Sequence, residues 1–179
     1  MTDDTKSRYL TLMAAYVLDH GFAAASLRPL AKAAGTSDRM LIYHFKSKDA
    51  LMVEVLTTLA DEFTAMLDGT LPKESAPSHR ALLEDVLSLV RSESALTYIR
   101  VWREVTTLAA MEQQAFIETG MVVIQRFIDW LACRMPVDDE NVIGSAEAML
   151  TVIEGVHVMD ALGRSDVVEH AIERLYPRA

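Results

Sequence analysis

The side chains best suited to chemistry lie between Gly35 and Lys48, where hydroxyl, basic and aromatic residues follow one another closely. Arginine can donate two hydrogen bonds to the edge of a guanine, and hydroxyl and lysine groups can bind phosphate oxygens. Gly35 can adopt the left-handed conformation that ends a helix, and Ser37 can cap the helix that follows. These residue types in this order suit the binding of nucleic acid.

A short helix is expected over residues 26–34, directly before this turn. Ser26 would cap it, and Pro29 would sit in its first turn, where no intrahelical N–H bond is lost. Four residues before Gly35, the small Ala31 lets two helices cross closely, while Leu41, six residues after it, faces inward. This spacing is typical of a helix-turn-helix, whose second helix enters the DNA major groove.

Residues 9–51 resemble the N-terminal DNA-binding domain of the TetR family of bacterial transcriptional regulators. One position departs from the family pattern: Ile42 replaces the aromatic residue that usually follows the recognition-helix leucine, and Tyr43 is the neighbouring phenol that can take over its phosphate contact. The matching positions are Gly21-Phe22, Ser26, Leu30-Ala31, Ala34-Gly35, Ser37, Leu41, Tyr43-His44-Phe45, Lys48 and Leu51.

The recognition helix would present Arg39 and Tyr43 on one face, with its N-terminal end toward the base edges. Arg39 is the best candidate for reading guanine, and Lys48 resembles the phosphate-binding lysine of the family. The alternative is that these charges are merely solvated. The predicted DNA-binding residues are Arg28, Thr36, Ser37, Asp38, Arg39, Met40, Tyr43, His44 and Lys48.

The charge is distributed unevenly along the chain. Its net value of -9 argues against nucleic acid, yet residues 1–48 carry seven Lys or Arg against four Asp, a net charge of +3. The remainder carries ten basic and 22 acidic residues. A basic N-terminal part can meet phosphate while the acidic remainder limits non-specific binding.

One cysteine, no signal-peptide pattern and no long uncharged apolar run predict a cytoplasmic, nucleoid-associated protein with no membrane partner. The apolar periodicity predicts an all-α fold, in which an N-terminal three-helix head precedes a helical bundle. The family resemblance implies that this bundle is a regulatory domain. We expect a DNA-binding domain over residues 1–48 and an effector-binding and dimerisation domain over residues 49–179. Besides the helix-turn-helix, helices are expected over 6–20, 47–67, 78–92, 95–110, 112–135, 138–163 and 165–176.

The segment 138–163 is apolar around nearly its whole circumference, which predicts burial on both sides. Asp138-Asp139 would start this helix, Gly163 would stop it, and Ser165 or Asp166 would cap the next. One side would face the chain's own core and the other a second subunit, as in the family's four-helix dimer interface. The alternative is a core helix of a monomer. The predicted interface residues of the homodimer are Val152, Gly155, Val156, Met159, Val168, Ile172 and Leu175.

The C-terminal part also contains aromatic and methionine residues at helical spacing, which suit a pocket for a small, mostly apolar effector. The same pattern is found in any helical core, so both interpretations stay open. Arg100 and Glu104 are expected to form an ordinary surface pair. The candidate ligand residues are Tyr98, Trp102, Phe116, Phe127, Met149, Glu154 and His157.

No pattern in the sequence indicates an enzyme. It contains no nucleophile elbow, phosphate-binding glycine loop or His-Glu-x-x-His motif, and its five histidines and Cys133 have no zinc-ligand spacing. We therefore expect no cofactor and no metal. The predicted function is a ligand-responsive repressor that binds a palindromic DNA operator as a dimer. The alternative is a helical adaptor that has kept the fold but lost specific operator binding.

Overall fold

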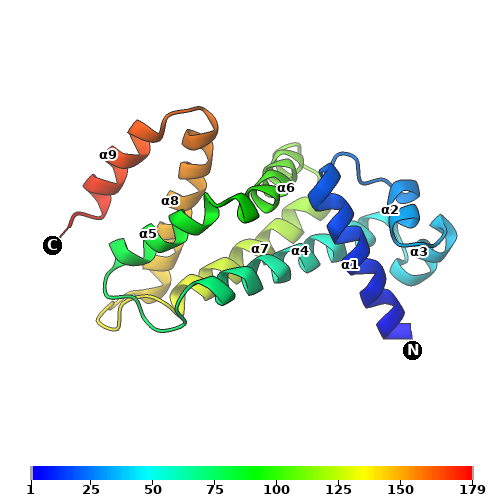
Figure 1. Ribbon diagram of the computed structural model, residues 1–179, viewed down its shortest axis with the longest axis horizontal. Coiled ribbons are helices and arrows are strands. Elements are labelled where there is room, and N and C mark those ends of the chain that lie inside the picture. Colours follow the sequence, from blue (N-terminus) through cyan, green and yellow to red (C-terminus); the bar gives the residue numbers. More distant parts are fainter. Residues whose placement is uncertain (1, 179) are drawn as a thin grey trace. The chain divides into compact units, whose positions relative to one another are not determined.

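The computed structural model describes residues 2–178, which form helices joined by short loops, with no strand among them (Figure 1). This confirms the expected all-α class, and each expected helix is present. The helices are α1 (Thr2–His20), α2 (Leu27–Ala33), α3 (Asp38–Phe45), α4 (Lys48–Thr70), α5 (His79–Val90), α6 (Glu93–Ala110), α7 (Gln114–Ala132), α8 (Val142–Ala161) and α9 (Ser165–Leu175).

The chain divides into two compact units. The first contains the residues up to Ala65 together with Glu93–Val123, and the second contains Met66–Ser92 together with the residues from Ile124 onward. Helices α4 and α7 each contribute to both units. The first unit therefore contains the predicted DNA-binding domain, most of α4 and all of α6. The functional division between residues 48 and 49 stays a prediction.

The core of the first unit joins α1, α2, α3 and α4 and also includes α6. Leu30 and Leu41 are fully buried, and Phe22 and Phe45 belong to the same core. From α6, Val101 and Val105 pack into the same cluster. Ile42 is 36% exposed, because the residue after Leu41 lies on the outer side of so short a helix.

The turn between α2 and α3 is held by backbone hydrogen bonds. Gly35 has a φ of 67°, its N–H donates to the Lys32 carbonyl, and the Thr36 N–H donates to the Ala31 carbonyl. These two bonds define the Schellman ending of a helix. The Ser37 hydroxyl then caps α3 by accepting the Met40 N–H at 3.3 Å. Ser26 lies at the N-cap of α2, but its hydroxyl makes no capping bond, which corrects the prediction.

In the second unit, α8 packs against both α5 and α9 (Figure 1). One face of α8 is buried through Ala146, Met149 and Ile153, whereas Val158 on another face is 52% exposed. Within this unit, the helix is therefore buried on one side only. By length and composition alone, α8 is also the one helix among the described residues that could cross a membrane.

The starts of α8 and α9 differ from the prediction. Helix α8 begins at Val142, not near Asp138, because the Asn141 side chain provides its cap and Asp139 accepts the Asn141 N–H at 2.7 Å. Arg164 occupies the N-cap of α9, so neither Ser165 nor Asp166 is its cap. Gly163, with a φ of 70°, ends α8 as predicted.

A buried guanidinium holds the end of α7 to the loop after α4. The Arg134 side chain is 7% exposed and donates to Asp68 Oδ1 at 2.6 Å and to the Pro72 and Trp130 carbonyls at 3.1 Å. It lies 3.9 Å from the centroid of the Trp130 ring, whose N–H also donates to Asp68. Each of the three guanidinium nitrogens therefore donates to an acceptor, which offsets the cost of burying the charge.

Arg134→Ala is expected to lower the free energy of unfolding by about 2–4 kcal/mol, because it removes several charge-assisted hydrogen bonds and leaves a cavity. Arg164→Ala is the control, since the Arg164–Asp166 pair is more than half exposed and such pairs are worth at most about 1 kcal/mol. Urea denaturation measures both. Equal losses in the two variants would contradict the importance of the buried network.

Candidate nucleic-acid interface

Helix α3 has one buried and one exposed side. Leu41 and Phe45 hold it to the core, while Arg39 and Met40 are exposed and Tyr43 is 64% exposed. Because Arg39 and Tyr43 are four residues apart, they lie on the same face of the helix. Ile42 is also exposed, so an aliphatic side chain stands on this surface beside the Tyr43 phenol. The exposed side can thus offer a guanidinium, a phenol and apolar groups to a major groove.

The other predicted residues of this surface are placed around the turn and around α3. Ser37 and Asp38 are exposed at the N-terminus of α3, and Thr36 is half-buried in the turn. His44 is also half-buried, with its ring 5.6 Å from Tyr9 and 5.2 Å from Tyr43, edge to face in both cases. The imidazole therefore also positions its aromatic neighbours.

Lys48 is the first residue of α4 and is exposed. Ser47 accepts the Ala50 N–H at 3.1 Å and so caps the helix, which leaves other N-terminal amides beside Lys48 for an anion. Lys46, which is not among the predicted DNA-binding residues, donates to the Tyr43 carbonyl at 3.1 Å, and its Nζ lies 5.6 Å from the centroid of the Tyr43 ring. It can support Tyr43 and add a positive charge near it. In the sequence, the signal for this contact was a lysine three residues after a tyrosine.

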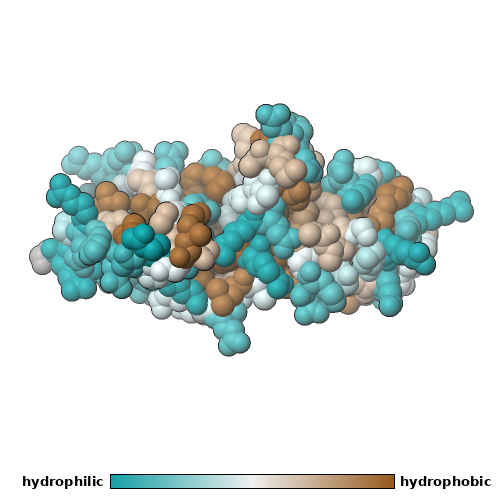
Figure 2. All heavy atoms as spheres, turned by 90° about the horizontal axis from the view of Figure 1, so that it is seen from above, coloured by the Kyte–Doolittle hydropathy of each residue, from teal (hydrophilic) through white to brown (hydrophobic). Residues whose placement is uncertain are grey.

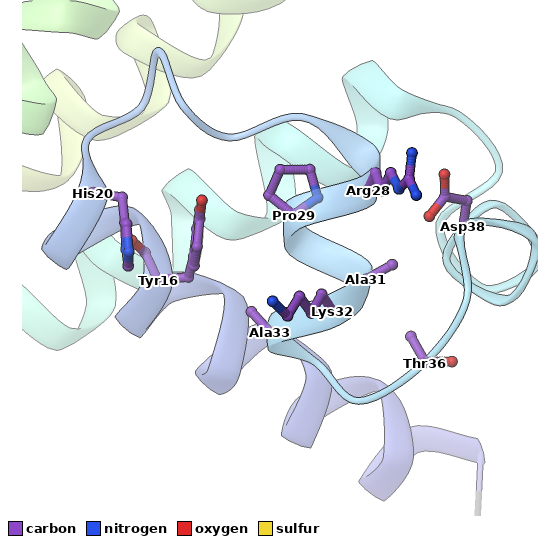
Figure 3. Close-up of a pocket in the computed structure, with 9 residues that line it drawn as sticks. All are labelled: Tyr16, His20, Arg28, Pro29, Ala31, Lys32, Ala33, Thr36 and Asp38. Carbon is purple, nitrogen blue, oxygen red and sulfur yellow. The ribbon is translucent and has the colours of Figure 1, made fainter.

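A groove of about 850 Å³ lies between α1 and α2 (Figure 3). In this view, Tyr16 and His20 stand on α1, opposite Pro29 and Lys32 on α2. The Tyr16 and His20 rings are stacked, with centroids 4.1 Å apart. The predicted contacts Arg28, Thr36 and Asp38 also line this groove, together with Ala31 and Ala33.

Some basic residues of the first unit bind a partner within the chain. Lys6 forms an ion pair with Glu54 of α4 at 2.7 Å and lies 5.1 Å from the centroid of the Phe45 ring. This pair fastens α1 to α4. Arg28, Arg39 and Lys48, by contrast, are exposed and stay the predicted basic contacts to DNA.

The predicted effector residues fall in both units. In the first unit, Tyr98, Trp102 and Phe116 are half-buried and pack against the core. The Phe116 ring meets Phe22 edge to face at 5.4 Å. In the second unit, Met149 and His157 are buried, and Phe127 and Glu154 are intermediate. These positions are compatible with core packing as well as with a ligand, so the ligand role stays a prediction.

Glu62 is a candidate that sequence reasoning missed. This carboxylate on α4 accepts a hydrogen bond from the Tyr98 hydroxyl, and burial raises the pKa of Glu62 above its ordinary value of 4.5. Burial and the neighbouring carboxylate also raise the pKa of Tyr98, so the phenol keeps its proton and donates. The available signal was an acidic residue next to the buried Phe63, whose ring lies 5.3 Å from that of Tyr98.

The expectation that Arg100 and Glu104 form an ordinary surface pair is wrong. Arg100 donates to the Leu18 carbonyl at the end of α1, and Glu104 accepts the Ala23 N–H at 2.6 Å. Both side chains of α6 therefore bind the backbone that connects α1 to α2.

The predicted dimer residues differ in accessibility within the second unit. Val156, Val168 and Ile172 are at most 8% exposed and belong to the chain's own core. Gly155 and Leu175 are exposed, whereas Val152 and Met159 are intermediate. Further apolar side chains are exposed on α8, and Figure 2 shows that apolar residues stand among hydrophilic ones on the surface of the protein. The additional exposed residues are Ile143, Val158 and Leu162.

Comparison with known proteins agrees with this geometry. Residues 15–55 match the family model described as bacterial regulatory proteins, tetR family. A crystal structure assigned as a transcriptional regulator from Streptomyces coelicolor A3(2) is 28% identical, with a TM-score of 0.72 over 95% of this chain and 96% of that chain. No match was found among curated proteins.

Two more distant structures share the fold along nearly the whole chain. A TetR transcription regulator from Haloarcula marismortui ATCC 43049 is 17% identical, with a TM-score of 0.69 over 96% of this chain and 94% of that chain. The multidrug binding protein EbrR, complexed with imidazole, is 21% identical, with a TM-score of 0.69 over 98% and 92%.

An all-α fold that exposes the second helix of a helix-turn-helix defines a DNA-binding transcriptional regulator, not an enzyme. Residues 15–55 belong to the TetR family of bacterial regulatory proteins, and solved structures of transcriptional regulators share the fold of nearly the whole chain.

Glu62→Gln is expected to stabilise the protein at neutral pH, because the amide removes a partly buried charge while its oxygen still accepts from Tyr98. The raised pKa of Glu62 means that the folded state holds this proton to higher pH than the unfolded state. The stability of the wild type should therefore fall as the pH rises through that range, and this part of the pH dependence should be absent in the variant. Urea denaturation between pH 4 and 8 measures it. A variant less stable than the wild type at pH 7 would show instead that the carboxylate has a favourable partner.

Proposed function

We propose that this regulator is a ligand-responsive repressor that binds a palindromic operator as a homodimer. The observation that carries the proposal is the exposed side of α3, where Arg39 and Tyr43 project from a helix held by Leu41 and Phe45. Arg39 reads a guanine edge, and the residues at the N-terminal end of α3 contact neighbouring bases. Arg28, His44 and Lys48 contact the phosphates on either side.

The dimer is supported by the two faces of α8. One face is buried in the second unit, and the other exposes Val158 and Leu162 to 52% and 70%, with the exposed Gly155 among them. Glycine permits close approach of a second helix, and apolar side chains on an outer face are stabilised when a partner covers them. We propose that this surface, with Leu175 of α9, pairs with the same surface of a second copy. A two-fold axis then relates the two recognition helices and makes the operator palindromic.

The ligand response is supported by the half-buried aromatic groups of α6 and α7. Tyr98 and Trp102 stand one turn apart on α6, and Glu62 adds a half-buried carboxylate beside Tyr98. Such a set suits a mostly apolar or aromatic molecule with one polar or cationic group. A structure titled as that of a multidrug binding protein shares this fold. The effector can lower the affinity for DNA by no more than the ratio of its own affinities for the two states, the one that does not bind DNA and the one that does.

A footprint on the DNA that flanks the gene, with and without candidate ligands, tests this function. Two protected half-sites with centres about 34–36 Å apart, or a multiple of that distance, are expected. Ligands that bind, as monitored by tryptophan fluorescence, should remove the protection. An asymmetric single half-site with a monomeric protein at micromolar concentration would contradict the dimeric repressor.

Arg39→Ala and Lys48→Ala are expected to act differently. Loss of Arg39 should cost about 1–3 kcal/mol on the operator and relax the sequence preference at one position of each half-site. Loss of Lys48 should weaken binding to all duplexes alike and reduce the salt dependence by about one unit of slope per subunit. Fluorescence anisotropy titrations at several salt concentrations measure both. If both variants lose the same affinity on operator and random DNA, the two roles are assigned wrongly.

A further inference from the structure

The C-terminal end of α1 is held by a side chain of α6. Arg100 Nη2 donates to the Leu18 carbonyl and lies 3.4 Å from the Asp19 carbonyl. The last carbonyl groups of a helix lack intrahelical partners, and a cation there also complements the helix dipole. Arg100 therefore fixes the point at which α1 ends.

One turn further along α6, Glu104 binds the segment that follows α1. Its Oε2 accepts the Ala23 N–H at 2.6 Å, a charge-assisted bond to backbone. Gly21 has a φ of 84°, and a Cβ built on it would lie 2.9 Å from Glu104 Oε1. Two features therefore favour glycine at position 21: its positive φ and the close approach of the Glu104 carboxylate, which leaves little room for a Cβ.

We propose that Arg100 and Glu104, here termed the α6 clamp, are positioning residues for operator binding. They hold residues 18–23, and through them α2 and the recognition helix α3, in the orientation that fits the major groove. This inference rests on the proposed function, because it assumes that the chain prefers a particular DNA sequence. The clamp touches backbone at both points, so it fixes the position of the connecting segment and not merely that of a side chain.

The need for such a clamp follows from the length of α2. Its seven residues are too few to form a stable helix alone, so its position depends on what holds its two ends. The Gly35 turn holds one end, and the connection from α1 holds the other. If that connection adopts several orientations, only a fraction of molecules present α3 correctly, and the apparent affinity for the operator falls by that fraction.

The clamp also connects α3 to the helix that carries predicted effector contacts. Trp102 lies two residues from both Arg100 and Glu104, which places it about 200° around the helix from each of them. One side of α6 therefore holds the connection between α1 and α2, while Tyr98 and Trp102 stand on another side. A displacement of α6 is passed to the connection through the clamp.

The experiment compares Glu104→Ala with Glu104→Gln, whose side-chain oxygen can still accept the Ala23 N–H. The probes are a duplex that the wild type selects from a random library and a scrambled duplex of the same composition. Glu104→Ala should weaken binding to the selected duplex about three- to tenfold, which corresponds to the net value of one ordinary hydrogen bond near the surface, with scrambled DNA unchanged. The Ala23 amide should exchange hydrogen faster. Glu104→Gln should restore most of the affinity.

Glu93→Ala is the matched control, since it removes an exposed carboxylate from the same helix, and it should bind as the wild type does. Arg100→Ala tests the clamp independently if Glu104→Ala does not fold; it should also weaken selected binding, and Arg103→Ala serves as its charge-matched control. Equal losses on both duplexes, or unchanged selected binding despite faster exchange at Ala23, would overturn the clamp. A wild type without sequence preference would instead contradict the proposed function itself.

Discussion

The burial of Leu41 and Phe45 is the constraint on which the DNA-binding surface depends. Helix α3 has eight residues and would not be stable alone in water. Ordering the backbone of the first turn is unfavourable, and the few hydrogen bonds of so short a helix do not offset it. Both side chains are at most 2% exposed, and they set which side of the helix is turned outward. Arg39 and Tyr43 face outward because Leu41 and Phe45 are held in the core.

Around this contact, the structure adds elements that fix the helix at its ends. Gly35 turns the backbone through a conformation that other residues adopt at a cost, and Ser37 caps the first turn of α3. Lys48 then begins α4, a helix that contributes to both compact units. The acidic composition of the rest of the chain is consistent with this arrangement, because the net positive charge then lies in residues 1–48, which contain the proposed DNA-binding surface.

Much of this arrangement could be predicted from the sequence. The helix-turn-helix follows from Gly35, Ser37 and the spacing of Leu41, since backbone conformation and apolar period act locally. The helices were all expected because their apolar residues recur at helical spacing. Helix ends were less certain: whether Asp139 or Asn141 caps α8 depends on the path of the loop, which no local pattern specifies.

Contacts between residues distant in the chain could not be predicted. Arg100 and Glu104 have the spacing of a surface pair, and only the fold brings the end of α1 within their reach. The same holds for Arg134, which finds Asp68 and Pro72 more than sixty residues away, and for Glu62 with Tyr98. Periodicity identifies which face of a helix is apolar, but it does not identify the partner that a polar side chain will find.

The central claim is that the exposed side of α3 recognises a specific DNA sequence. The most direct measurement is the affinity of the wild type for its selected duplex and for a scrambled duplex, titrated by fluorescence anisotropy over a range of salt concentrations. We expect the selected duplex to bind at least about 10³-fold more tightly at physiological salt, with a steep salt dependence for both duplexes. Equal affinities for the two duplexes at every salt concentration would contradict it.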